Sequence, residues 1–108
     1  MRVKSPKHLD WIRSLPCTVC ENPHETEAAH VRMSEASVGK PITGIGIKPD
    51  DSWVTPLCGV CHRQQHEEDE RRFWFRYGIN PIRLALALWQ ASGDYERGLI
   101  ILKHARTL

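Results

Sequence analysis

Four cysteines in two identical pairs constrain this chain more than any other feature. Cys17 pairs with Cys20 and Cys58 with Cys61, each with two residues between, and residues 21–57 separate the pairs. Each pair can present two sulfurs to one point, and four thiolates suit a tetrahedral Zn²⁺. Redox-active or oxidised cysteines, and four buried thiols, are the alternatives; cysteines spaced this closely rarely pair in a reducing compartment except as redox motifs. The spacing therefore predicts a structural zinc site.

Length and composition predict one small globular domain. The chain has 108 residues, of which 41% are hydrophobic and 26% charged, a typical make-up for a folded globule. No apolar run reaches the length of a membrane span, so we expect no membrane partner. The first fifteen residues contain basic side chains but no apolar central stretch, so we expect no secretory signal and a cytoplasmic location. A domain this small gains from a metal staple.

The overall charge predicts no strongly charged partner. Fifteen Lys and Arg against thirteen Asp and Glu leave a formal charge of +2. Four thiolates around one Zn²⁺ would cancel that excess. Any nucleic-acid binding must then come from a local basic patch or from a metal, because the whole-molecule field is weak.

Capping residues and hydrophobic patterning predict a small α+β fold. Ser5 and Pro6 are typical of a helix start, as are Asn80 and Pro81, and Gly78 is typical of a helix end. The expected elements are a helix over 5–15, strands over 26–33 and 53–57, and helices over 60–76, 80–92 and 94–106. Residues 34–49 form a long loop with glycines and prolines, more typical of a functional segment than of an idle one.

The histidines offer metal-binding and proton-transfer chemistry. His62 and His66 are four apart in the expected 60–76 helix, so their rings project from one face and could bind one divalent ion. An ordinary pair of surface histidines is the alternative. His30 stands alone in the expected 26–33 strand, where a neutral imidazole could act as a general base or as a hydrogen-bonded core residue.

Three segments together carry a family resemblance. Residues 17–20, 27–31 and 51–66 resemble an HNH endonuclease of the ββα-metal superfamily with an added four-cysteine zinc. The tail, with Trp74, residues 78–81 and the Leu88-Trp89 pair, is similar to small phage-encoded HNH proteins, the Ref (recombination enhancement function) nuclease type among them. The resemblance implies a single HNH nuclease domain over residues 1–108. It consists of a zinc-stapled ββα-metal core over 17–77, preceded by an N-terminal helix, and a helical extension over 78–108.

The resemblance also implies roles for individual residues. His30 would activate water for hydrolysis of a DNA phosphodiester bond, leaving a 5′-phosphate and a 3′-hydroxyl. His62 and His66 would bind the catalytic divalent ion, and the four cysteines the structural zinc. The host-cell cytoplasm would be the location of a phage-encoded protein.

Two departures from the family pattern concern the catalytic metal. The residue before the base is commonly a His or Asp ligand, but here it is Ala29, and the middle Asn has no clear counterpart. Asp51 could complete the metal shell or orient His30; His24 and Glu27 are the other candidates for a third ligand. The ion could be Mg²⁺ or Mn²⁺ arriving with DNA, or a more tightly bound Zn²⁺.

Several basic side chains could hold DNA phosphates. They are Arg32, Lys40, Lys48 and Arg63, and none of them specifies a base. Residues 67–70 are acidic and are expected on an exposed helix face beside Arg71 and Arg72, while the aromatic residues at 73–75 are expected in the core.

Three functions fit these observations. The first is a metal-dependent DNA endonuclease. The second is a zinc-containing DNA-binding module without catalysis, motivated by Ala29. The third is a zinc domain that binds proteins during phage recombination or host take-over, and a homodimer or a recombination protein would then be the partner.

Overall fold

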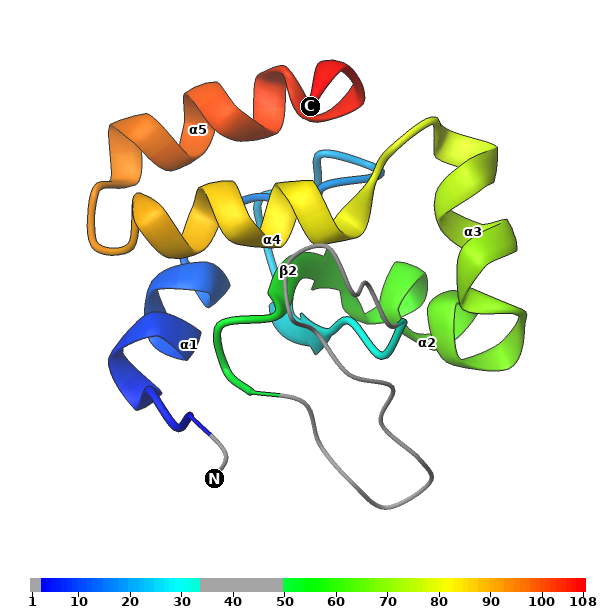
Figure 1. Cartoon of the computed structure of the whole chain (residues 1–108), viewed down its shortest axis with the longest axis horizontal. Helices are drawn as coiled ribbons and strands as arrows, with labels where there is room; N and C mark the ends of the chain where they lie inside the picture. Colours follow the sequence, from blue (N-terminus) through cyan, green and yellow to red (C-terminus); the bar gives the residue numbers. More distant parts are fainter. Residues whose placement is uncertain (1–2, 34–49) are drawn as a thin grey trace.

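A computed structural model describes residues 3–33 and 50–108, which form a small α+β fold. The described part contains two antiparallel strands, five α-helices and a short 3₁₀ helix: α1 (Pro6–Arg13), β1 (Thr26–His30), β2 (Val54–Cys58), α2 (Gly59–Glu67), α3 (Glu70–Tyr77), α4 (Pro81–Gln90), α5 (Tyr95–Lys103) and η2 (Ala105–Thr107). In Figure 1, α4 and α5 lie side by side, and α1 and α3 lie towards opposite ends of the molecule. Among the described residues, no helix has the length and apolar character to cross a membrane.

The two strands form the centre of the fold. They pair antiparallel from Thr26 opposite Cys58 to His30 opposite Val54. All five residues of β2 are buried, because α1, α2 and α4 all pack against that strand. Pro56 is tolerated in β2 because the strand has only β1 as a ladder neighbour among the described residues. β1 ends at His30, three residues earlier than expected.

The helix boundaries follow the capping signals, with one exception. Ser5 Oγ accepts a hydrogen bond from the backbone N–H of His8, and Gly78 ends α3 in the left-handed conformation with φ of 67°. The single helix expected over 60–76 is wrong. Asp69 interrupts it and caps α3 by accepting a hydrogen bond from the Arg72 backbone N–H at 3.1 Å.

The break also divides the acidic segment at 67–70 between two helices. Glu68 forms an ion pair with Arg76 at 3.0 Å, and the Asp69 side chain accepts a hydrogen bond from the Arg72 backbone. At these two positions, the expected pairing with the side chains of Arg71 and Arg72 is therefore wrong.

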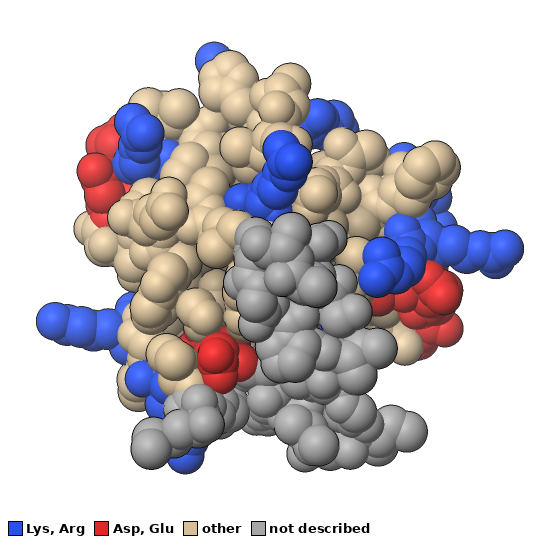
Figure 2. Space-filling model, viewed as in Figure 1, with Lys and Arg blue, Asp and Glu red and all other residues tan. Residues whose placement is uncertain are grey.

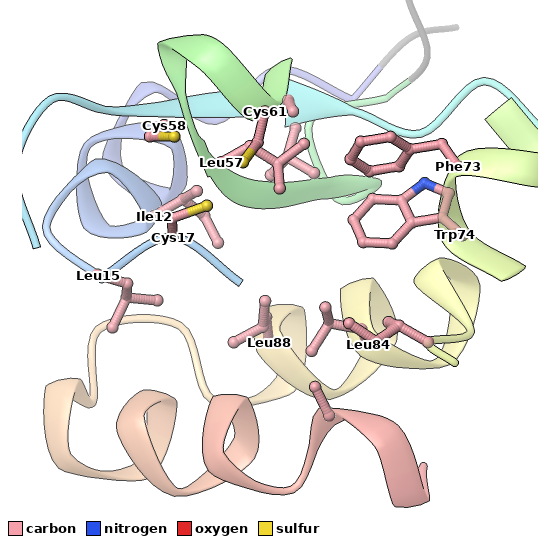
Figure 3. Packing of buried hydrophobic residues seen from close by; sticks show 14 residues of the cluster. Ile12, Leu15, Cys17, Leu57, Cys58, Cys61, Phe73, Trp74, Leu84 and Leu88 are labelled. Carbon is pink, nitrogen blue, oxygen red and sulfur yellow. The ribbon is translucent and has the colours of Figure 1, made fainter. Parts of the chain in front are cut away.

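The hydrophobic core joins the hairpin to the C-terminal helices. Phe73 and Trp74 pack edge to face, with ring centroids 5.0 Å apart, and Leu84 and Leu88 of α4 approach from the other side (Figure 3). Three of the four cysteines belong to the same buried cluster. Phe75, which was also expected in the core, is 87% exposed.

A buried histidine, not expected from the sequence, joins α1 to the end of α4. His8 is 1% exposed, its Nδ1 atom lies 2.6 Å from Ser92 Oγ, and its ring meets Trp89 edge-on at 4.8 Å between centroids. Burial lowers the pKa of His8 from 6.5 to about 4, although the negative charge of Asp51 acts in the opposite direction.

We predict that His8 weakens the fold in mild acid. Between pH 6.5 and about 4 the unfolded chain binds a proton at His8 and the folded chain does not, so the free energy of unfolding falls as the pH is lowered through this window. Urea unfolding of His8→Asn should show a shallower loss over this range. His104→Asn, at an exposed histidine, should follow the parent. Parallel curves for the parent and His8→Asn would contradict the prediction.

Candidate functional site

The four cysteines converge from three elements. Cys17 and Cys20 lie in the turn after α1, Cys58 is the last residue of β2, and Cys61 lies in the first turn of α2. Their sulfur atoms all lie within 4.8 Å of one another, and Cys20 Sγ is 3.5 Å from Cys58 Sγ. That separation is too long for a disulfide bond, and it is close to the edge of about 3.8 Å that a tetrahedron with Zn–S bonds of about 2.3 Å would have. The cluster is therefore able to hold a metal ion such as zinc.

The ionisation of the cluster gives a second reason to expect a cation. Burial raises the pKa of Cys58, but the Cys61 backbone N–H and the neighbouring thiols outweigh it and lower the pKa to about 7. The pKa of Cys61 is raised, first by burial and then by the adjacent sulfur atoms. A thiolate therefore forms readily at Cys58, while the raised pKa of Cys61 opposes a second charge beside it. A bound dication would relieve this conflict, because its positive charge offsets half of the negative charge that four thiolates carry.

A threonine between the first two cysteines fastens their turn to the hairpin. The backbone N–H and the hydroxyl of Thr18 both donate to the carbonyl oxygen of Pro56, at 2.9 and 2.8 Å. The Cys17 backbone N–H donates to the Asn22 carbonyl at 2.9 Å, which closes the turn. Thr18 thus sets one cysteine pair beside the other. Only its place between two cysteines could have drawn attention to it in the sequence.

His30 is held by a buried carboxylate. Its Nε2 atom lies 3.0 Å from Asp51 Oδ1, and the other oxygen of Asp51 accepts a hydrogen bond from the Ser5 backbone N–H at 2.8 Å. Asp51 is 3% exposed, whereas the His30 side chain keeps 15% of its surface accessible. The sequence left two roles open for Asp51, as a metal ligand or as the residue that orients His30. The contact with His30 fits the second role.

The helix histidines lie together and contact a carboxylate from β1. His62 Nε2 is 3.1 Å from His66 Nε2, and His62 Nδ1 is 2.7 Å from Glu27 Oε1. Two nitrogens at this spacing can both lie about 2.0–2.1 Å from one ion, so the pair fits a divalent metal. Burial and then the nearby charges of His62 and Arg32 lower the pKa of His66, while Glu70 opposes them.

A third ligand for that pair is not assembled by the described residues. Within residues 3–33 and 50–108, the cysteine cluster is the one group of three or more potential ligands whose donor atoms all converge. The three candidates for a third ligand lie elsewhere or contact other groups. Glu27 contacts His62 but not His66, Asp51 contacts His30, and His24 lies in an exposed turn. Ala29 is fully buried in β1 opposite Thr55.

One of the comparisons with known proteins assigns the chain to a family. A family model described as a protein of unknown function, DUF968, matches residues 1–93. The chain belongs to the DUF968 family. No curated protein and no solved structure matches it. The DUF968 match includes the four cysteines, the His30–Asp51 pair and the whole of α2, and stops before α5.

Glu70 connects β1 to the histidine helix of this DUF968 protein. Its carboxylate accepts hydrogen bonds from the backbone N–H groups of Arg32 and Met33, each at 3.0 Å, and from Gln65 Nε2 at 2.6 Å. Two backbone amides just after β1 and one side chain of α2 therefore share the Glu70 carboxylate. Sequence reasoning assigned Glu70 to an exposed acidic run and missed this role.

The basic residues expected to bind DNA are only partly placed. Arg32 lies near enough to His66 to influence its pKa. Arg63 lines a cavity of about 420 Å³ together with Glu27 and Gly59. Lys40 and Lys48 lie outside the described residues. On the face in Figure 2, the Lys and Arg side chains drawn in blue are dispersed, with acidic groups beside several of them.

We predict that the cysteine cluster stabilises the domain through bound zinc. Cys17→Ser should lose zinc, measured by elemental analysis, and its thermal midpoint should fall by roughly 10–20 °C, since each lost kcal/mol costs about 4–8 °C in a domain of this size. Glu21→Gln, an exposed change in the same turn, should keep the zinc and the midpoint. A Cys17→Ser protein with unchanged stability would contradict a structural zinc.

Proposed function

We propose that this DUF968 protein is a metal-dependent DNA endonuclease of the HNH type. The observation that supports it best is the placement of two histidine sites on adjoining elements. The His30–Asp51 pair lies at the end of β1, and the His62–His66 pair lies on α2, which follows β2 directly and packs against β1. A two-stranded hairpin followed by a helix is also the order that the resemblance to ββα-metal enzymes implies.

The protein side chains divide the chemistry of hydrolysis. His30 accepts a proton from the attacking water, and the carboxylate of Asp51 holds the imidazole and stabilises its charged form. His62 and His66 hold a divalent ion, which when bound supplies positive charge to the scissile phosphate and the leaving oxygen. Zinc at the four cysteines, in this proposal, is structural.

Arg32 lies between the two proposed sites along the chain. It follows His30 by two residues, and its positive charge acts on His66. A phosphate bound by Arg32 would lie near His66 of the proposed metal pair. Arg63, in the middle of α2, is a second candidate for a contact with the DNA backbone, because it lines the cavity near Gly59. Such contacts position DNA without reading its sequence.

A DNA-binding module without catalysis is the second candidate. It is favoured by Ala29, which cannot ligate a metal at the position where the HNH pattern commonly has His or Asp. With two protein ligands the ion would be held weakly. DNA binding with steep salt dependence, and no cleavage with Mg²⁺, Mn²⁺ or Zn²⁺, would favour this alternative.

The decisive experiment is cleavage of supercoiled plasmid by the zinc-loaded protein with Mg²⁺ or Mn²⁺. We expect nicked or linear product from the parent, and a rate lower by roughly 10²–10⁴-fold for His30→Ala, because a general base contributes about that much. His104→Ala, at an exposed histidine in the C-terminal helical region, should cleave like the parent. Circular dichroism and zinc content should match in all three proteins. Equal cleavage by His30→Ala would remove His30 as the base.

A further inference from the structure

Glu27 determines which nitrogen of His62 carries the proton. The distance from Glu27 Oε1 to His62 Nδ1 is 2.7 Å. A carboxylate can only accept a hydrogen bond, so Nδ1 must be the donor. His62 then presents the lone pair of Nε2, and it does so towards Nε2 of His66, 3.1 Å away. A histidine in water favours the opposite tautomer, with the proton on Nε2, so the contact selects the less common form.

The local backbone leaves space for this carboxylate. Glu27 lies on β1 and projects towards the start of α2, where Gly59 is the first helical residue. A Cβ atom at Gly59 would lie 3.3 Å from Glu27 Oε2, which is closer than most such contacts allow. Glycine therefore permits the carboxylate to approach the first turn of α2 and to reach His62 one turn further on.

The position of Glu27 separates it from the ligands themselves. It contacts His62 on the nitrogen remote from His66, and its side chain is 54% exposed. Solvent screens its charge at that exposure, so its effect on a bound ion comes mainly from the direction of the hydrogen bond. A carboxylate in this arrangement orients a metal-binding imidazole from behind, as outer carboxylates do in zinc enzymes.

We propose that Glu27 is a positioning residue that prepares His62 and His66 to bind a transition-metal dication in preference to Mg²⁺. Two imidazole nitrogens suit Zn²⁺, Co²⁺ or Ni²⁺, whereas Mg²⁺ favours oxygen ligands. The inference rests on the proposed function in one respect, that His62 and His66 are the metal ligands. It deepens that function by assigning Glu27 a role and the ion a chemical class.

The first measurement is the tautomer of His62, read from ¹⁵N chemical shifts of the zinc-loaded protein before any second metal is added. We expect the Nδ1–H form in the parent and mainly the Nε2–H form in Glu27→Ala. Glu27→Gln retains an acceptor oxygen and should retain much of the Nδ1–H form. The Nε2–H form in the parent would overturn the inference, since neither a second metal nor DNA is involved in this readout.

The second measurement is calorimetric titration of the zinc-loaded protein with Co²⁺ and, separately, with Mg²⁺. Co²⁺ should bind the parent more tightly than Mg²⁺, and Glu27→Ala should weaken Co²⁺ binding by roughly 10–100-fold, as is typical when an outer partner of a ligand is lost. Glu67→Ala removes the same charge next to His66 and should leave the affinity within about twofold of the parent, because an exposed charge is screened.

The outcomes separate this inference from the nuclease proposal. Tight Co²⁺ binding that depends on Glu27, with no DNA cleavage, would support the inference and count against the nuclease. Cleavage of DNA by a protein in which Glu27→Ala changes neither the tautomer nor Co²⁺ affinity would support the nuclease and overturn the inference. Equal weakening by Glu67→Ala would show a general charge effect and would also overturn it.

Discussion

Four sulfur atoms bring together the turn after α1, the end of β2 and the first turn of α2. The first cysteine pair belongs to the turn after α1, and the second spans the junction of β2 and α2. A metal bound by all four would fix the start of α2 relative to α1 and the hairpin. His62 follows Cys61 directly, and successive helical residues point about 100° apart. The direction of the His62 ring is thus a geometric consequence of where the sulfur of Cys61 is held.

The same junction explains why one carboxylate can serve the histidine pair. Thr26, the first residue of β1, pairs with Cys58, the last residue of β2. Glu27 follows Thr26 and lies opposite Leu57, next to the β2–α2 junction. Any change in how the sulfurs set α2 on the hairpin would move His62 relative to Glu27. In this arrangement, loss of the cluster would alter the tautomer of His62 through the short β2–α2 junction.

Local signals in the sequence were sufficient for the cysteine site and for most helix ends. Spacing of two residues between cysteines, or a serine before a proline, acts within one turn of backbone and does not depend on the rest of the fold. The break at Asp69 was missed although its signal is also local, because Asp69 lies within the acidic run at 67–70, which fits an exposed helix face equally well.

Contacts between distant segments could not be predicted in this way. Thr18 meets Pro56, and Glu70 meets the amides of Arg32 and Met33, because the hairpin and helices bring them together. The spacing of these residues along the chain does not predict these contacts. The burial of His8 is of the same kind, since it depends on α1 packing against the end of α4.

The cysteine cluster and the His62–His66 pair differ in how far they are exposed to solvent, and this difference fits the different roles proposed for them. Cys17, Cys58 and Cys61 are buried in the core, so an ion held there has protein on most sides and little access to substrate. The His66 side chain is exposed, and His62 keeps 21% of its surface accessible. Structural metal sites are closed by protein ligands, and catalytic ones keep positions for water or substrate. No third ligand converges on the histidine pair among the described residues. In the proposed nuclease, this would weaken the hold of the pair on an ion and would also leave coordination positions for a phosphate oxygen and water.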